Sequence, residues 1–453
     1  MSLREKLQTL RNEMPAEQLP PQKPSARNIA AYSALKTRIH HKILDRVDLA
    51  AMESMPADRL KHEIALLVER LVGEEQVAIN DLERSILVRD IQHEMLGLGP
   101  LEVLMADPTI SDILVNTHGQ VFVERRGKLE PTEVTFSDDQ HLMRIIDKIV
   151  SRVGRRIDES SPMVDARLPD GSRVHAIIPP VAIDGPILSI RRFAAVPLTM
   201  EDLVSEHKSL TESMARLLES LIRAKVNMLV SGGTGSGKTT LLNVLSGYIP
   251  HSERIVTIED AAELQLRQPH VVRLETRPPN IEGKGEIPQR LLVKNALRMR
   301  PDRIIVGEVR GAEAFDMLQA MNTGHEGSLT TIHANTPRDG LARLENMIGM
   351  AGFNLPPKAM RQQIASAINV VVQVARLTDG KRKVVSIQEI TGMEGDIVTM
   401  QEIFAYRQLG IGPEGAVMGH FQATGVRPKF MDRLKAYGEA LPDAMFDPTK
   451  RYA

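Results

Sequence analysis

The chain has 453 residues, with 57 Lys and Arg against 58 Asp and Glu, so its formal net charge is −1. A content of 42% hydrophobic and 25% charged residues is ordinary for a globular protein, and the length predicts two or three domains. The absence of Cys excludes disulfides and cysteine-ligated metal centres. The near-neutral charge and an aromatic content of only 3% count against a nucleic-acid partner.

The first hundred residues divide into a tail and a helical segment. Residues 1–28 carry four prolines among polar residues and are predicted to be a disordered tail. In residues 29–99 apolar positions recur at helical spacing, broken near Pro56 and Gly73, which predicts a bundle of three short helices. The N-terminus has no signal-peptide pattern, and the longest apolar run, INVVVQVA, is too short to span a bilayer. We therefore expect a soluble protein.

The predicted secondary structure of the rest of the chain changes twice. Residues 100–198 contain short β-like runs and one amphipathic helix, which predicts a small α+β domain. Residues 199–209 are predicted to be a linker. From residue 210 to 453 strands and helices alternate, which predicts a parallel sheet with helices on both faces and an antiparallel extension after Pro356. The fold class is therefore α/β.

A glycine-rich loop follows the first strand of this last domain. The run VNMLVSGGTGSGKTT fits the pattern G-x-x-x-x-G-K-[ST], in which backbone N–H groups surround phosphates, the lysine reaches the β- and γ-phosphates and the hydroxyl binds Mg²⁺. ATP and Mg²⁺ are the predicted cofactors. The predicted binding residues of the loop are Gly232, Gly233, Thr234, Gly235, Ser236, Gly237, Lys238, Thr239 and Thr240.

Carboxylates stand at the ends of two buried strands downstream. Glu308 ends DRIIVGE, a position that orders Mg²⁺ or its water in phosphate-loop enzymes. Glu259, Asp260 and Glu263 follow the strand RIVTIE, and one of them is needed to orient the attacking water; spacing alone does not choose among them. The predicted metal-binding residues are Thr239, Glu259 and Glu308.

Histidines and arginines complete the set of candidates. His325 and His333 lie at either end of the strand SLTTI and are predicted to sense the γ-phosphate. Arg173, Arg191 and Arg192 of the α+β domain are candidates for phosphate contact across a cleft. The arginines between Arg290 and Arg310 divide between surface ion pairs and a residue acting in a neighbouring subunit.

These motifs, in this order, resemble the secretion ATPase superfamily of type II and type IV secretion and type IV pili. The glycine loop matches its Walker A motif, TIEDAAEL its Asp box, IIVGEVRG its Walker B motif and TGHEGSLTTIHAN its His box, over roughly residues 80–425. The resemblance implies a RecA-like ATPase domain and a ring of six subunits. It also implies that Glu263 is the catalytic glutamate, and that Lys238, Glu308, His325 and His333 share the catalytic work.

Within this superfamily the chain is most similar to the Tad or Flp pilus motors, also called CpaF. The resemblance rests on EITGMEGDIVTMQEIF and GHFQATGVRPKF, while Ala261 replaces the usual proline of the Asp box. It implies a cytoplasmic homohexamer, peripheral at the inner membrane, that acts on pilus platform proteins. Three alternatives stay open: a type IV secretion traffic ATPase, a nucleic-acid translocating ATPase and a small-molecule kinase.

Overall fold

The structure is a computed structural model that describes residues 26–46, 56–75, 77, 79–125, 127–192, 197–279, 284–352 and 354–452. Most of the predicted tail, residues 1–25, lies outside these ranges. The chain forms two compact units, Met1–Asp107 with Glu133–Ile149 and Pro108–Thr132 with Val150–Ala453. No helix in the described part of the chain is long and apolar enough to cross a membrane.

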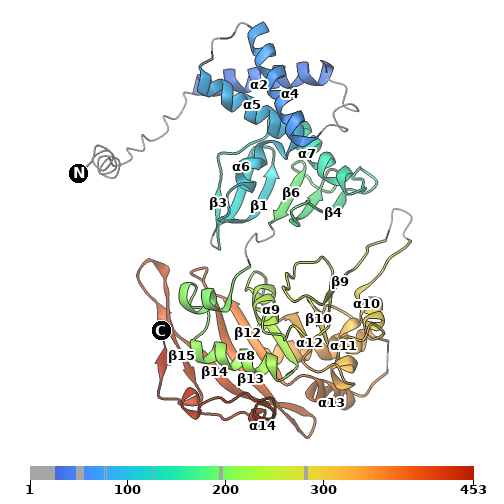
Figure 1. Ribbon diagram of the computed structural model, residues 1–453, viewed down its shortest axis with the longest axis vertical. Helices are drawn as coiled ribbons and strands as arrows, with labels where there is room; N and C mark the ends of the chain where they lie inside the picture. The colour runs from blue at the N-terminus through green and yellow to red at the C-terminus, as the bar shows by residue number, and fades with distance from the viewer. Residues whose placement is uncertain are drawn as a thin grey trace, which may run out of the picture. The chain divides into compact units, whose positions relative to one another are not determined.

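In the described part of the first unit, helices lie where the periodicity of residues 29–99 predicted them (Figure 1). They are α2 (Ala26–Arg46), α4 (Ala57–Glu74) and α5 (Asp81–Leu96). A capping box begins α5: the Asn80 side chain accepts from the Glu83 N–H at 2.8 Å, and the Glu83 carboxylate accepts from the Asn80 N–H at 3.0 Å. Leu, Ile and Val side chains from all three helices are buried in one shared core. This unit also holds η1 (Gly99–Leu101), α6 (Glu102–Met105) and most of α7 (Asp139–Arg152).

The second unit begins with an antiparallel sheet of six strands in the order β3-β2-β1-β6-β5-β4. Its central strands alternate between buried and more exposed residues, as in β5, because one face is packed and the other is open. The strands are β1 (Ile110–Thr117), β2 (Gln120–Arg125), β3 (Lys128–Pro131), β4 (Met163–Arg167), β5 (Arg173–Ile177) and β6 (Ile187–Arg191).

A ten-stranded sheet forms the remainder of this unit, in the order β16-β15-β14-β13-β12-β7-β11-β10-β8-β9. The strands from β12 to β9 in that order run parallel, and those from β13 to β16 add an antiparallel extension. The extension begins one strand later than predicted, because β12 pairs in parallel with β7. The parallel strands are β7 (Met228–Gly232), β8 (Ile255–Glu259), β9 (Val271–Glu275), β10 (Arg303–Val306), β11 (Leu329–His333) and β12 (Val370–Arg376). The antiparallel ones are β13 (Arg382–Glu394), β14 (Ile397–Ile411), β15 (Val417–Ala423) and β16 (Arg451–Tyr452).

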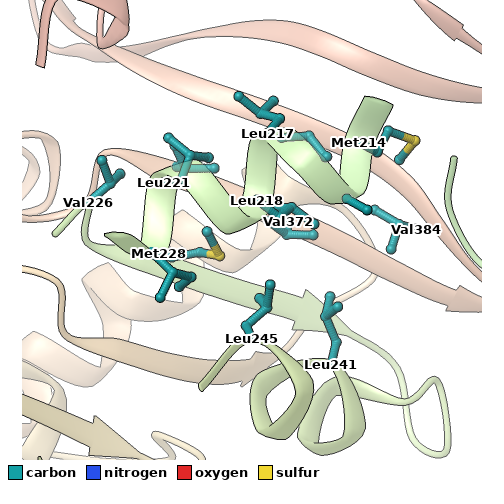
Figure 2. Close-up of a cluster of buried hydrophobic side chains, with 14 of the residues drawn as sticks. Met214, Leu217, Leu218, Leu221, Val226, Met228, Leu241, Leu245, Val372 and Val384 are labelled. Carbon is teal, nitrogen blue, oxygen red and sulfur yellow. The ribbon is translucent and has the colours of Figure 1, made fainter. Parts of the chain in front are cut away.

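Helices cover both faces of the parallel sheet, as predicted. Successive residues of β7 point to opposite faces, so Met228 and Val230 enter one buried cluster and Leu229 the other. On the first face, Figure 2 shows side chains of α8, such as Leu217 and Leu221, in one buried cluster with Met228 of β7 and with Leu241 and Leu245 of α9. The helices on this face are α8 (Glu212–Arg223) and α9 (Lys238–Ser246). Those on the second are α10 (Gln289–Ala296), α11 (Glu313–Asn322), α12 (Pro337–Met350) and α13 (Pro357–Ala367).

Short elements join and finish this unit. The segment predicted as a linker contains a π-helical turn, η2 (Asp202–Glu206), whose Leu203 is buried in the first-face core. The C-terminal part adds η3 (Pro413–Gly415), α14 (Met431–Ala436) and η4 (Asp443–Phe446). Glu389 of β13 holds α14 in place, because its carboxylate accepts from the N–H groups of Lys429 and Phe430 at 3.0 Å each.

Candidate nucleotide-binding and hydrolysis site

The glycine loop lies between a buried strand and a helix, the setting that its sequence pattern requires. Strand β7 ends at Gly232, and α9 begins at Lys238 (Figure 1). Gly235 and Gly237 have φ values of +66° and +95°, a left-handed conformation that residues with a Cβ rarely adopt. Loops of this conformation can direct successive backbone N–H groups and the N-terminus of the following helix toward one anion, which is how proteins bind phosphate.

A cavity of about 1070 Å³ opens beside this loop. The sheet order places β7 next to β11, β10 and β8, so residues at the carboxyl ends of these strands meet there. Residues of the six-stranded sheet also line it. Of the predicted site residues, the lining contains Arg173, Arg191, Arg192, Thr234, Gly235, Ser236, Gly237, Lys238, Thr239, Thr240, Glu259, Glu263, Glu308 and His333.

Lys238 is held inside the loop. Its side chain is buried, and Nζ donates to the Gly233 carbonyl at 2.9 Å. Burial lowers the pKa of Lys238, and the nearby Glu308 carboxylate opposes that shift. An incoming phosphate would offer the ammonium group a stronger, charged partner than this carbonyl.

Glu259 and Glu263 have different surroundings although only three residues separate them. Glu259 is 3% exposed, and its Oε1 accepts from the N–H groups of Glu263 and Leu264 at 2.8 and 3.0 Å. A Cβ on Gly307 would lie 2.9 Å from the Glu259 Cγ, so this glycine permits the carboxylate to pass. Glu259 therefore orders the turn that carries Glu263. Its Oε2 has no hydrogen-bond partner among the described residues, and burial raises the pKa of this carboxyl.

Glu263 is the more accessible of the two carboxylates. Its side chain is 25% exposed, and its Oε1 accepts from Nη1 of Arg173 in β5 at 2.6 Å. Asp260 is exposed and also lines the cavity; partial desolvation raises the pKa of its carboxyl, and Arg310 Nη1, from the segment after β10 of the same sheet, lies 3.4 Å from its Oδ2. Of the three carboxylates left open by spacing, only Glu263 combines access to the cavity with a partner from the other sheet.

Glu308 follows β10 and is paired with an arginine two residues on. Arg310 Nη2 donates to Glu308 Oε2 at 2.8 Å, and this hydrogen bond raises the pKa of Arg310. Gln289 of α10 donates to the Glu308 carbonyl at 3.0 Å. Glu313 accepts from the Arg310 and Gly311 N–H groups at 2.6 and 2.7 Å, which starts α11 directly after this turn. The backbone on both sides of Glu308 is thus fixed.

The two histidines lie at opposite ends of β11. His333 is the last residue of that strand and lines the cavity. His325 precedes the first strand residue, Leu329, by four positions, and a strand of five residues spans about 16 Å. The lining formed by the described residues includes neither His325 nor Gly232 and Gly233. The structure therefore brings one histidine, and not both, to the phosphate loop.

Three site residues were missed by sequence reasoning. Arg376 ends β12, Arg382 begins β13 and Glu124 lies in β2; all three line the cavity. The available signal was two arginines on either side of the turn LTDGK, directly after a buried strand. It was not decisive, because the sequence does not show that this strand is the neighbour of β7.

No group of three or more His, Asp or Glu side chains within the described ranges is arranged to hold a metal ion. A magnesium ion at a nucleotide site does not need such a cage, because it takes most of its ligands from phosphates and water. Thr239 and Glu308 of the cavity lining, with the free Oε2 of Glu259, fit that requirement.

Comparison with known proteins places the chain in a family. Residues 94–411 match the family model described as type II/IV secretion system protein. The chain belongs to this family. A putative conjugal transfer protein of Mycobacterium tuberculosis is 39% identical over 325 residues, which are 70% of this chain and 92% of the relative.

Two further similarities were found. The conjugal transfer protein TrbB of Rhizobium radiobacter is 34% identical, over 68% of this chain and 91% of that protein. The solved VirB11 ATPase of the Brucella suis type IV secretion system is 31% identical, with a TM-score of 0.35, over 64% of this chain and 92% of that one. The protein is accordingly an ATP-hydrolysing enzyme of the secretion and pilus type.

Proposed function

We propose that ATP binds in the cavity beside the glycine loop, with Lys238 on the β- and γ-phosphates and Thr239 on Mg²⁺. Glu308 and Glu259 hold the water shell of the metal, and Glu263 orients the attacking water. His333 contacts the γ-phosphate, and Arg173, Arg191 and Arg192 face the phosphates from the six-stranded sheet. The observation that carries this proposal is the convergence of these side chains on one cavity of the second unit.

His325 has a different place in this proposal. Its Nδ1 is buried and has no hydrogen-bond partner among the described residues. The carbonyl of His325 accepts from the Ser328 hydroxyl at 2.7 Å, which fixes the turn into β11. We propose that His325 senses nucleotide only indirectly, through the strand that ends at His333.

The machine that this motor drives is proposed from the relatives. Two of them are described as conjugal transfer proteins, and a solved relative belongs to a type IV secretion system. We propose that the chain is the traffic ATPase of a type IV secretion-like apparatus. It would work as a homohexamer in the cytoplasm, docked on inner-membrane components, with no nucleic acid as its direct partner.

A Tad-type pilus motor is the second candidate. The observation that favours it is the additional structure outside the family match, namely helices α2 and α4, most of α5, and the segment after residue 411. In that case the partners are the platform proteins of the pilus. The core chemistry is the same in both candidates, so only the transported product separates them.

Lys238→Ala tests both the proposed ATP site and the proposed class of partner. The purified variant should fold but lose ATP hydrolysis, because the loop then lacks the ammonium group that binds the β- and γ-phosphates. Circular dichroism checks the fold, and phosphate release, with and without added DNA, checks turnover and partner class. Retained turnover would place the active site elsewhere.

The same substitution in the producing organism separates the two machines. We expect loss of DNA transfer or protein secretion with surface filaments still present. Loss of filaments with transfer and secretion intact would identify the pilus motor instead. If filaments, DNA transfer and protein secretion were all unaffected, a transport role would be contradicted altogether.

A further inference from the structure

Two arginines lie directly opposite each other in the hairpin between β12 and β13. Arg376 and Arg382 are register partners in this antiparallel pair, so their side chains are on the same face. Like charges in this arrangement repel and destabilise a sheet. Both arginines nevertheless lie at the cavity, which indicates that their charges have a function there.

Arg382 contacts the glycine loop, and Arg376 lies close to it and donates to the Gly127 carbonyl of the six-stranded sheet's β2–β3 turn. Strand β12 runs parallel to β7 with Val374 opposite Gly232, which places the hairpin beside the loop. Arg382 Nε donates to the Gly235 carbonyl at 2.8 Å. A Cβ on Gly235 would lie 3.5 Å from Arg376 Nη1, and one on Gly237 would lie 3.4 Å from Arg382 Cδ.

This contact supports the orientation that phosphate binding needs. A loop whose N–H groups point inward to an anion must turn carbonyls outward, where they require donors of their own. The Gly233 carbonyl is bound by Lys238 and by the Ser236 hydroxyl, both within the loop. The Gly235 carbonyl instead takes its donor from Arg382, outside the loop.

A single carboxylate of the six-stranded sheet joins the two arginines. Glu124 of β2 has Oε1 3.3 Å from Arg382 Nη2 and Oε2 3.5 Å from Arg376 Nη1. Its side chain is only 15% exposed, so solvent screens this pairing less than it would at the surface. One negative charge between two positive charges leaves a net positive charge beside the phosphate loop.

We propose that Arg376 and Arg382 are positioning residues of the phosphate loop, and that Glu124 ties their placement to the six-stranded sheet. Displacement of this sheet would draw the arginines away from Gly235 and weaken ATP binding. By linkage, bound ATP would resist the same displacement. The inference goes beyond the transport role and rests only on the proposal that ATP binds at the glycine loop.

Steady-state kinetics of single and double variants test this inference. Arg382→Gln should raise the KM for ATP about tenfold or more, the usual weight of a charged hydrogen bond, with a smaller change in kcat. Glu124→Gln should raise it by a smaller factor. The double variant should raise the KM by less than the product of the two single effects, because part of the effect of Glu124 is transmitted through Arg382 and the rest through Arg376. Independent, multiplying effects would overturn the coupling.

Two further variants serve as a conservative substitution and a matched control for this test. Arg382→Lys keeps the positive charge but cannot bind the Gly235 carbonyl and the Glu124 carboxylate together. The KM of this variant for ATP should therefore stay near that of Arg382→Gln. A KM equal to the wild-type value would show that Arg382 contributes only its charge, and it would overturn the proposed positioning role. Arg407→Gln is the matched control, because Arg407 pairs with Glu402 in β14 at 2.8 Å, outside the cavity lining.

Lys238→Ala separates failure of this inference from failure of the proposed site. An inactive Lys238→Ala beside an unchanged KM in Arg382→Gln would refute only the positioning role. An active Lys238→Ala would refute the site itself.

Discussion

Glu263 is bound by an arginine in this structure, and that contact has a chemical consequence. Glu263 Oε1 accepts from Arg173 at 2.6 Å, which ties the orientation of this carboxylate to β5 and leaves its second oxygen to accept from a water. The γ-phosphate carries more negative charge than a carboxylate and competes for the same guanidinium. Nucleotide binding would thus weaken the contact that orients Glu263.

Glu263→Gln should therefore separate binding from turnover. We expect normal affinity for a fluorescent ATP analogue and a loss in kcat of about 10² to 10⁴, the usual range for a positioned base. Equilibrium titration and phosphate release measure the two quantities.

Glu259→Gln is the informative comparison for that variant. A glutamine can still accept from the Glu263 and Leu264 N–H groups, so its loss of kcat should be smaller than that of Glu263→Gln. The reverse order would assign the catalytic role to Glu259.

Residue-level chemistry was predictable only where the local pattern specifies it. The loop from Gly232 to Thr239 could be placed between a strand and a helix because the spacing of its glycines and lysine is a local pattern. The different surroundings of Glu259 and Glu263 could not be predicted, because they depend on burial and on Arg173, which is 90 residues away in the chain. His325 illustrates the same limit, since only the course of β11 decides which histidine meets the cavity.

At the scale of elements, periodicity predicted most helices and strands of the described ranges. The continuous apolar character of runs such as MLVSG and RIIV predicts parallel strands, and both strands are buried along their whole length in the structure. The order of the strands is set by long-range pairing, which no local pattern contains. The hairpin carrying Arg376 and Arg382 was consequently predicted as an antiparallel extension, with no link to the site.

A buried ionic cluster joins elements of the first unit and gives it a pH dependence. Glu94 of α5 accepts from Lys36 of α2 at 2.7 Å and contacts His141 Nε2 of α7 at 2.8 Å. Burial raises the pKa of Glu94, but the His141 hydrogen bond and the charge of Lys36 outweigh it and lower the pKa to about 2. Because the folded state then binds fewer protons than the unfolded state, its stability rises with pH between the folded-state pKa of about 2 and the ordinary value of 4.5.

We expect this cluster to contribute about 3 kcal/mol above pH 5 and to lose it as the pH falls from 4.5 toward 2. Hydrogen-exchange protection factors of the α5 amides should decrease over this range. Glu94→Gln should remove most of the decrease, while Glu63→Gln on the exposed face of α4 should leave it unchanged. Equal slopes in wild type and Glu94→Gln would refute the assignment.

At the scale of the whole molecule, the charges around the cavity bear on why a ring would be required. Five cavity arginines each lie against a carboxylate of the same chain. Hydrolysis needs positive charge on the transition state, and charge beyond that of Lys238, Mg²⁺ and Arg192 would come from rearrangement of these pairs or from a neighbouring subunit. The five are Arg173, Arg191, Arg310, Arg376 and Arg382.

We therefore expect turnover to depend on assembly. Six chains of 50.2 kDa should sediment with ATP as a species of about 300 kDa, and ATPase activity per chain should rise with protein concentration over the range in which this species forms. Sedimentation velocity and phosphate release on the same samples measure the two curves. The reason is that a neighbouring chain both supplies charge and excludes water from a cavity that one chain leaves accessible. Constant activity per chain down to concentrations at which only the 50.2 kDa species remains would show that one subunit is sufficient, and the arginine pairs would then have to open within it.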